Sequence, residues 1–447
     1  MLPRLITRLV GWAVALFYDL ERTGPKLPSG PVLVAANHPN ALVDPLVIFR
    51  TGGRPTRPLA KAPLFEQALV GTVLKGLGGL PVYRRQDDPA RMHLNDRTFD
   101  AAIEALQAGG AVQIYPEGQS HSEPALAPLR TGAARIALLA ESRAGWGLGL
   151  KIQPVGLTYT RKHLFRGRVI AVFGEPIEVS DFRDAHERDD REAARQLTSL
   201  IRERLEALTL NFDEAEDREL VEVAERLYAH AKGLTQARHR DRMADRLPRM
   251  QRFAEGLRRL RDEDPERLEA LRHSVRRYLR LLTLFGATDG DVPTRYRTWP
   301  VLRYTLRQLA MLVLVLPVAA VGAVCWFTPF IVTRKVAPRF RPELDQVATY
   351  TLSIASLAFP VWLALLAAGV WVVFGGRPMI AVLVLLPIAG FATVAWRDRQ
   401  AVVLEDARIF LRARRRSESR DRLAEQRTRL VAEFDSVVEE WRTRANE

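Results

Sequence analysis

The chain has 447 residues, of which 47% are hydrophobic and 26% are charged, enough for one large domain or two ordinary ones. Its single cysteine, Cys325, excludes an intramolecular disulfide and therefore the class of small secreted domains held together by disulfides. The formal net charge of +14 predicts an anionic partner: phospholipid headgroups, phosphorylated substrates or nucleic acid.

The N-terminal residues carry Arg4 and Arg8 ahead of an apolar run over 9–18. This arrangement is similar to a signal peptide, but charged residues follow it instead of a small-residue cleavage site. An apolar segment flanked by arginines is also typical of a helix that lies in the membrane interface. We therefore interpret residues 1–22 as an interfacial helix.

Residues 23–184 alternate strand-like and helix-like patterns. Short apolar runs bounded by turn residues predict strands over 31–36, 78–83, 111–118, 151–159 and 168–174. Helical spacing occurs over "LNDRTFDAAIEALQAGG" and over "RTGAARIALLAESR", where Thr131 is a candidate N-cap. Alternation of this kind predicts an α/β domain.

The stretch "AANHPNALVDP", residues 35–45, follows the first of these predicted strands. His38 therefore comes at the end of a buried strand, where α/β domains place their ligands. A neutral imidazole takes a hydroxyl proton near pH 7, and a carboxylate such as Asp44 fixes its tautomer. The pair is a candidate base with its orienting acid. Taken alone, the spacing is weak evidence, and it favours a histidine that merely caps a strand or helix.

A second candidate element, "YPEGQSHSEP", follows the predicted strand over 111–118. Gly118 lets backbone N–H groups approach an anion, and Glu117 offers an acceptor to substrate hydroxyls. The alternative is a polar turn. Ser120 lies in "GQSHS", which lacks the last glycine of the G-x-S-x-G nucleophile elbow, so a serine nucleophile is not predicted.

Two arginines are candidate ligands for a phosphate ester. Arg84 ends the strand-like "GGLPVYRR", and Arg130 in "PLRTGAAR" precedes a predicted helix N-terminus. Guanidinium groups and unpaired helix N–H groups both suit phosphate. As isolated residues they are also consistent with ordinary surface charges.

The C-terminal half divides into three predicted regions. Residues 185–300 are rich in Arg, Glu, Leu and Ala, which predicts a connector of amphipathic helices. Residues 301–397 hold three long apolar runs, over 308–333, 346–376 and 378–396. We interpret them as membrane helices, the last two as a hairpin around "GGRP"; buried helices of a soluble core are the alternative.

Residues 398–447 form a predicted cytosolic amphipathic tail. Its apolar residues recur at spacings of three, four or seven: Leu423, Leu430, Phe434, Val437 and Trp441. Such a helix is also a candidate surface for homo-oligomer formation.

In order and combination, "NHPNALVD", "GLPVYR", "PEGQS" and "IQPVGLTY" resemble the four successive sequence blocks of the glycerol-3-phosphate and lysophosphatidate acyltransferase superfamily. The resemblance covers about residues 20–180. It implies a mixed sheet flanked by helices. It also implies that His38 deprotonates a glycerol hydroxyl with support from Asp44.

The same resemblance implies that Arg84, Glu117 and Gly118 help to bind the phosphorylated acceptor, while Pro154 and Val155 match the fourth block. Ser120 and Arg130 are further candidate substrate-binding residues. One feature departs from the family pattern, because five residues rather than four separate His38 from Asp44. The turn after His38 must absorb the extra residue, which on a helix would rotate the acid by ~100°. A longer form of this kind resembles a subgroup of glycerol-3-phosphate acyltransferases that includes fungal ones.

The sequence thus predicts a membrane-bound O-acyltransferase of phospholipid synthesis that acts on glycerol-3-phosphate or lysophosphatidate. Acyl-CoA or acyl-carrier protein is the expected co-substrate, with no metal or cofactor, and the apolar runs speak against a nucleic-acid partner. The alternatives are a remodelling acyltransferase for another lysophospholipid and a non-catalytic membrane scaffold.

Basic residues predict the orientation in the membrane. Arg334, Lys335, Arg339 and Arg341 precede the hairpin, and Arg397, Arg399, Arg412 and Arg414 follow it. Positive-inside reasoning places both flanks, and with them the catalytic domain, on the cytoplasmic side. Residues 308–333 then have to enter and leave the membrane on one side, as a bent or re-entrant segment.

Overall fold

The computed structural model describes residues 11–83, 95–160, 162–232, 242–284, 298–340, 343–415 and 417–444. The chain divides into two compact units. The sheet unit comprises Met1–Asn211 together with Thr333–Ser356, and the helical unit comprises Phe212–Val332 together with Leu357–Glu447.

The sheet unit is built on eight strands in the order β1-β7-β6-β2-β5-β3-β4, with the short β8 also paired to β6. Their bounds are β1 Tyr18–Thr23, β2 Val32–Ala36, β3 Arg57–Lys61, β4 Leu80–Val82, β5 Ala111–Ile114, β6 Lys151–Tyr159, β7 Gly167–Phe173 and β8 Ile177–Glu178. Pairing is parallel except where β7 and β8 meet β6. The sheet is therefore mixed, as predicted, and each predicted strand run contains a strand.

The N-terminal segment differs from its predicted form. Residues 11–17 are helical, but Tyr18–Thr23 form β1 and pair with β7. Val14 and Phe17 are buried in the core of the sheet unit, and Tyr18 is fully buried. The predicted interfacial helix over 1–22 is wrong for its last residues, because an edge position in the sheet satisfies their backbone groups.

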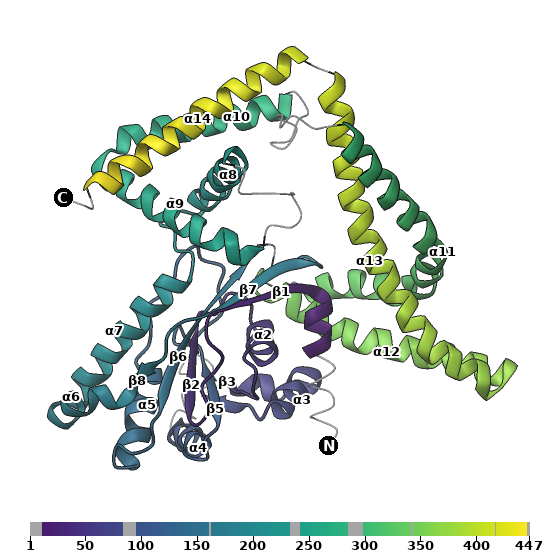
Figure 1. The fold of residues 1–447 in the computed structure, drawn as a ribbon. Helices are drawn as coiled ribbons and strands as arrows, with labels where there is room; N and C mark the ends of the chain where they lie inside the picture. Colours follow the sequence, from purple (N-terminus) through teal and green to yellow (C-terminus); the bar gives the residue numbers. More distant parts are fainter. Residues whose placement is uncertain are drawn as a thin grey trace. The chain divides into compact units, whose positions relative to one another are not determined.

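Helices cover both faces of the sheet (Figure 1). α2 (Val43–Thr51) and α3 (Ala68–Gly76) contribute to one core, and α4 (Asn95–Gln107), α5 (Gly132–Arg143) and α7 (Asp190–Leu208) to the other. Residues of β2 alternate between the two, since Val32 and Val34 join the first core while Leu33 and Ala35 join the second. Burial on both faces explains the unbroken apolar run of this strand.

The sheet unit is longer than the domain predicted over 23–184. After η3 (Val179–Phe182) and α6 (Arg183–Arg188), α7 buries Leu197, Ile201 and Leu205 against the sheet core. The first turns of α12 (Val347–Phe374) also belong here, because Ala348 and Leu352 are buried with residues of α2. One membrane helix therefore begins inside this unit.

The helical unit contains α8 (Ala215–Ala231), α9 (Met243–Glu263), α10 (Pro265–Leu284) and α14 (Ser417–Arg444), which share one apolar core. Buried ion pairs join them, as Asp217 accepts from Arg261 and Arg272. The C-terminal stripe contributes Leu423, Leu430, Phe434 and Val437 to this core, while the side chain of Trp441 lies outside the described residues. The stripe thus has an intramolecular role, and homo-oligomer formation stays a prediction.

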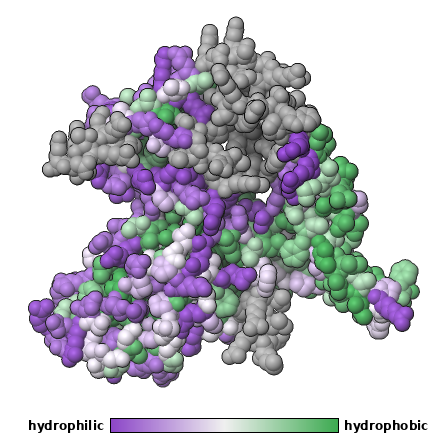
Figure 2. Space-filling view, viewed as in Figure 1, coloured by the Kyte–Doolittle hydropathy of each residue, from purple (hydrophilic) through white to green (hydrophobic). Residues whose placement is uncertain are grey.

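Three helices are long and apolar enough to cross a membrane: α11 (Thr298–Val336), α12 and α13 (Gly376–Arg415). Figure 2 shows hydrophobic residues, in green, gathered on the exposed surface of this region. Gly375, at φ +83°, separates α12 from α13, so the "GGRP" turn divides two helices as predicted. α11 is one continuous helix despite Pro317 and Pro329, and η5 (Ala337–Phe340) follows it. The apolar run over 308–333 therefore has no break of the kind that a re-entrant segment needs.

Indole N–H groups connect these helices. Pro329 has no N–H, so the carbonyl of Cys325 four residues earlier has no helical donor; the Nε1–H of Trp362 donates to it at 2.8 Å. Trp326 donates to the carbonyl of Leu386 and Trp396 to that of Leu312, each at 2.9 Å. These three bonds join α11 to α12 and to α13.

Candidate functional site

His38 and Asp44 meet at the carboxyl end of β2. His38 follows the strand by two residues, and Asp44 is the second residue of α2. The ring Nδ1 lies 2.9 Å from Oδ2 of Asp44. The intervening turn accommodates the extra residue, with Ala41 in the left-handed region at φ +32°. The two side chains are therefore in contact despite the longer spacing, and their catalytic role stays a prediction.

Asp44 is fully buried and held by two further donors. Its Oδ1 accepts from the hydroxyl of Tyr159 at 2.6 Å, and its Oδ2 accepts from the backbone N–H of Asn40 at 2.7 Å. Burial, followed by the nearby charge of Asp44, raises the pKa of Tyr159, so that its hydroxyl stays a donor. The carboxylate is thus fixed in one orientation toward the imidazole.

The imidazole of His38 presents its other nitrogen to the surroundings. The ring stacks on Tyr115 with centroids 4.0 Å apart, and 17% of the side chain is exposed. Because Nδ1 faces Asp44, Nε2 is the nitrogen that remains for a substrate proton. In neutral histidine a proton on Nδ1 leaves Nε2 as an acceptor, which is the form a general base requires.

The backbone around His38 is fixed on both sides. Its N–H donates to Oε1 of Glu117 at 2.7 Å, and its carbonyl accepts from the N–H of His121 at 3.1 Å. The side-chain amide of Asn37 pairs with the backbone of Leu157 on β6 in both directions, at 3.0 and 2.7 Å. The histidine thus depends on the loop that carries Glu117.

Glu117 is buried, and both of its oxygens have protein partners. Oε1 accepts from His38, while Oε2 accepts from the N–H of Ala127 at 2.8 Å and contacts Nε2 of His121. The hydrogen bond that His121 donates to Glu117 raises the pKa of His121, against the opposing effect of burial. In this arrangement Glu117 positions the loop, and its contact with a substrate hydroxyl stays a prediction.

The other predicted site residues divide into two groups. Gly118 has φ +75°, and a Cβ there would lie 2.7 Å from Nε of Arg130, so the absence of a side chain lets the guanidinium lie against the loop. Ser120 donates to Oδ2 of Asp345 at 2.5 Å. Arg130 is exposed and immediately precedes α5. Arg84 lies outside the described residues.

Sequence reasoning did not assign several residues that complete the site. Tyr159, Asn40 and His121 contact the predicted pair or its loop, although all three lie within or beside the quoted stretches. Asn40 had a usable signal, since it is a second asparagine directly after "NHP". Among the described residues, no cluster of three or more His, Cys, Asp or Glu side chains could hold a metal ion.

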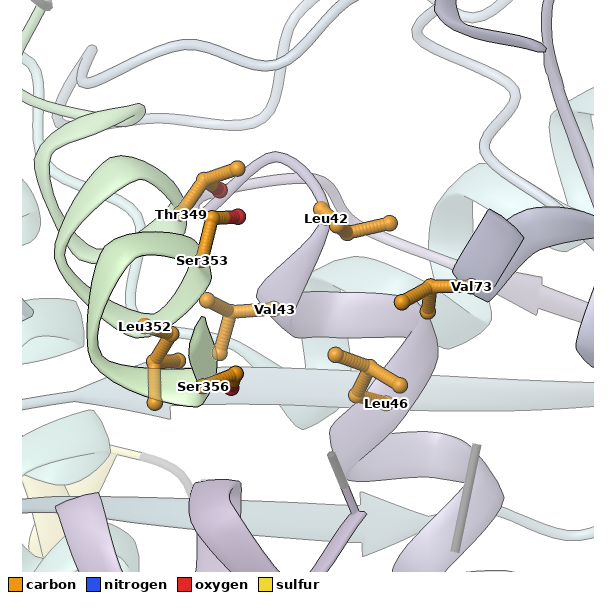
Figure 3. A pocket seen from close by; sticks show the side chains of 8 residues that line it. All are labelled: Leu42, Val43, Leu46, Val73, Thr349, Leu352, Ser353 and Ser356. Carbon is orange, nitrogen blue, oxygen red and sulfur yellow. The ribbon is translucent and has the colours of Figure 1, made fainter. Parts of the chain in front are cut away.

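A small pocket lies behind this site, within the sheet unit (Figure 3). Leu42, Val43, Leu46 and Val73 form one wall, and Thr349, Leu352, Ser353 and Ser356 of α12 form the other. The hydroxyls of Ser353 and Ser356 point toward α2 (Figure 3). The lining includes Leu42 and Val43, the two residues before Asp44, so the pocket and the site share the start of α2.

Two protein families match consecutive parts of the chain. The family "Acyltransferase" matches residues 19–158, and the family "Glycerol-3-phosphate acyltransferase 2 C-terminal domain" matches residues 220–444, about half of the chain. An uncharacterized acyltransferase of Schizosaccharomyces pombe is 24% identical over 48% of this chain and 43% of its own. Glycerol-3-phosphate O-acyltransferase 2 of Saccharomyces cerevisiae is 32% identical over 31% of this chain and 19% of its own.

Two further comparisons cover a larger share of the other protein. A 1-acyl-sn-glycerol-3-phosphate acyltransferase of Bacillus subtilis is 28% identical over 35% of this chain and 70% of its own. The crystal structure of the 1-acyl-sn-glycerophosphate acyltransferase from Thermotoga maritima aligns with a TM-score of 0.35 at 20% identity, covering 46% of this chain and 79% of that one. The matches span less than half the length of the yeast relatives.

The two family matches follow one another along the chain and cover both the site and the C-terminal helices. The chain belongs to the glycerol-3-phosphate and lysophosphatidate acyltransferase superfamily.

Proposed function

We propose that this protein transfers a fatty acyl group from an acyl thioester to a hydroxyl of glycerol-3-phosphate, with lysophosphatidate as the second candidate acceptor. The observation that carries the proposal is the His38–Asp44 pair, with Nδ1 on the buried acid and Nε2 directed away from it. The match of residues 220–444 to a domain named for glycerol-3-phosphate acyltransferase 2 favours the first acceptor.

The chemistry follows from this pair. Nε2 of His38 accepts the hydroxyl proton as the acceptor oxygen attacks the thioester carbonyl, and the C–O bond forms as that proton leaves. Asp44 stabilises the imidazolium. The tetrahedral intermediate then collapses, the C–S bond breaks, and the proton on Nε2 passes to the departing thiolate. No enzyme-bound acyl group is required, so we expect sequential kinetics.

Arg130 and the N-terminus of α5 are the proposed ligands of the acceptor phosphate among the described residues. The guanidinium of Arg130 lies against Gly118. α5 begins at Gly132, two residues after Arg130, and the first backbone N–H groups of a helix have no acceptor within the helix. Arg84 is proposed as a second phosphate ligand on the grounds of its sequence block. Acyl-CoA or acyl-carrier protein is the proposed donor, and the cytoplasmic side the proposed location.

The test is acyl transfer by the purified full chain in lipid nanodiscs. Thiol release from acyl-CoA is measured with glycerol-3-phosphate, lysophosphatidate and other lysophospholipids as acceptors, and the product is identified by mass spectrometry. His38→Ala should lower kcat by ~10²- to 10⁴-fold, the usual contribution of a general base. The exposed His163 supplies the matched control, His163→Ala. Wild-type protein that releases no thiol with any acceptor contradicts the proposal and favours a non-catalytic scaffold.

A further inference from the structure

Asp345 is a buried acid outside the motifs that define the site. It lies two residues before α12 and is 3% exposed. Within the described part of the chain, the hydroxyl of Ser120 is the hydrogen-bond donor that the structure gives to its carboxyl group. Burying an acid with so little compensation is costly, so the position calls for a reason beyond stability. The N-terminal end of α12 compensates part of this cost, because the helix dipole stabilises a negative charge there.

Ser120 connects Asp345 to the site. The two residues are 225 positions apart in sequence. Ser120 is next to His121, whose backbone N–H donates to the carbonyl of His38, and three residues after Glu117, which accepts from the N–H of His38. The Asp345 bond therefore holds the middle of the loop whose two ends fix the backbone of His38.

A second set of contacts joins the same helix to the acid of the pair. Ala348 and Leu352 are buried in one core with Val43 and Leu46 of α2, which lie one residue before and two residues after Asp44. The first turns of α12 thus contact both the loop behind His38 and the helix that carries Asp44. Further along, from Leu357, α12 continues as an apolar helix of the helical unit.

We propose that Asp345 is a positioning residue of the acyltransferase site: through Ser120 it sets the 117–121 loop, and hence His38, from the start of a membrane helix. The inference rests on the proposed function. It predicts that loss of the Asp345–Ser120 bond lowers kcat while leaving the KM of both substrates nearly unchanged, because the Ser120 hydroxyl is directed to Asp345 and the bond acts on the loop that orients the base. A rise in the acceptor KM would instead support the predicted binding role of Ser120.

The experiment is a double-mutant cycle in nanodiscs with Asp345→Ala, Ser120→Ala and the double variant. Each single change should lower kcat by about tenfold, and the double variant should be no slower than either single one, since residues in one contact are not additive. Asp345→Asn retains an acceptor oxygen for Ser120 and should restore most of the rate. Glu343→Ala removes an exposed acid two residues away and is the matched control.

Hydrogen exchange supplies a readout that does not depend on turnover. The amides of His121 and Ala127, bonded to His38 and Glu117, should exchange faster in Asp345→Ala and Ser120→Ala than in wild type. Inactive wild-type protein would refute the proposed function but leave this exchange test valid. If Asp345→Ala does not accumulate in membranes, Ser120→Ala decides, because it removes the same bond. Normal kcat, multiplicative effects in the cycle or unchanged exchange overturn the proposal.

Discussion

Asp44 does more than pair with an imidazole. Its two oxygens accept from Tyr159 and Asn40 while one of them also faces Nδ1 of His38. A carboxylate can serve these three donors at once, whereas an amide has a single acceptor oxygen.

Asp44→Asn is therefore expected to lower kcat by ~10²-fold or more, since its NH₂ group would face a donor or force the other tautomer of His38. Steady-state kinetics against both substrates measure this. Binding of the acceptor should change little. A comparable rise in KM with unchanged kcat would mean that Asp44 supports the fold of the binding site and does not orient the base.

His121 adds a pH dependence to the same loop. Its hydrogen bond to Glu117 raises its pKa above the ordinary value of 6.5, so the folded state binds a proton more tightly than the unfolded state does. The stabilisation is complete below pH 6.5 and declines as the pH rises through the raised value.

We expect the melting temperature of the wild type to fall more steeply between neutral and alkaline pH than that of His121→Gln. Thermal unfolding across this range measures the difference. His163→Gln, at an exposed position of the same unit, serves as the control. Parallel profiles for wild type and His121→Gln would show that the Glu117 contact does not persist in solution.

At the scale of elements, one hydrogen bond between membrane helices replaces a bond that a proline removes. Trp362→Phe keeps the apolar volume but leaves the carbonyl of Cys325 without its donor. In an apolar environment such a bond contributes about 1 kcal/mol.

Trp362→Phe should consequently unfold at a lower denaturant concentration in detergent than Trp371→Phe, which changes a more exposed tryptophan of the same helix. Equal unfolding midpoints for the two variants would indicate that water or detergent satisfies the carbonyl in both.

At the scale of the whole molecule, local patterns predicted the interior of the sheet unit well. β2, β5, β6 and β7 are buried runs bounded by turn residues, so their hydrophobic pattern was sufficient to find them. β1 was predicted as part of an interfacial helix because it follows the arginine-flanked apolar run over 9–18, and its strand form comes from pairing with β7 about 150 residues later. Non-local pairing of this kind leaves no local signal.

The candidate site shows the same division. His38 and Asp44 were found because they are close in sequence and chemically distinctive. Tyr159 and Asp345 reach the site from 115 and 225 residues away from their partners, Asp44 and Ser120. Their roles follow from tertiary contacts, and nothing in their flanking residues distinguishes them from ordinary core or surface positions.

The packing of α14 bears on whether the chain crosses the membrane an even or an odd number of times. α8, α9 and α10 precede the apolar helices and α14 follows them, yet all four share one core, which can form only in one aqueous compartment. We therefore expect the chain to return to the side that it left, which favours an even number of crossings. In the predicted α12–α13 hairpin, Gly376 then lies on the opposite side. In a Cys325→Ala background, cysteines replacing Glu219 of α8 and Arg429 of α14 should both react with an impermeant reagent from the same side of sealed vesicles, and a cysteine at Gly376 from the opposite side. Labelling of the first two from opposite sides would mean that α14 leaves the bundle when the protein enters a membrane.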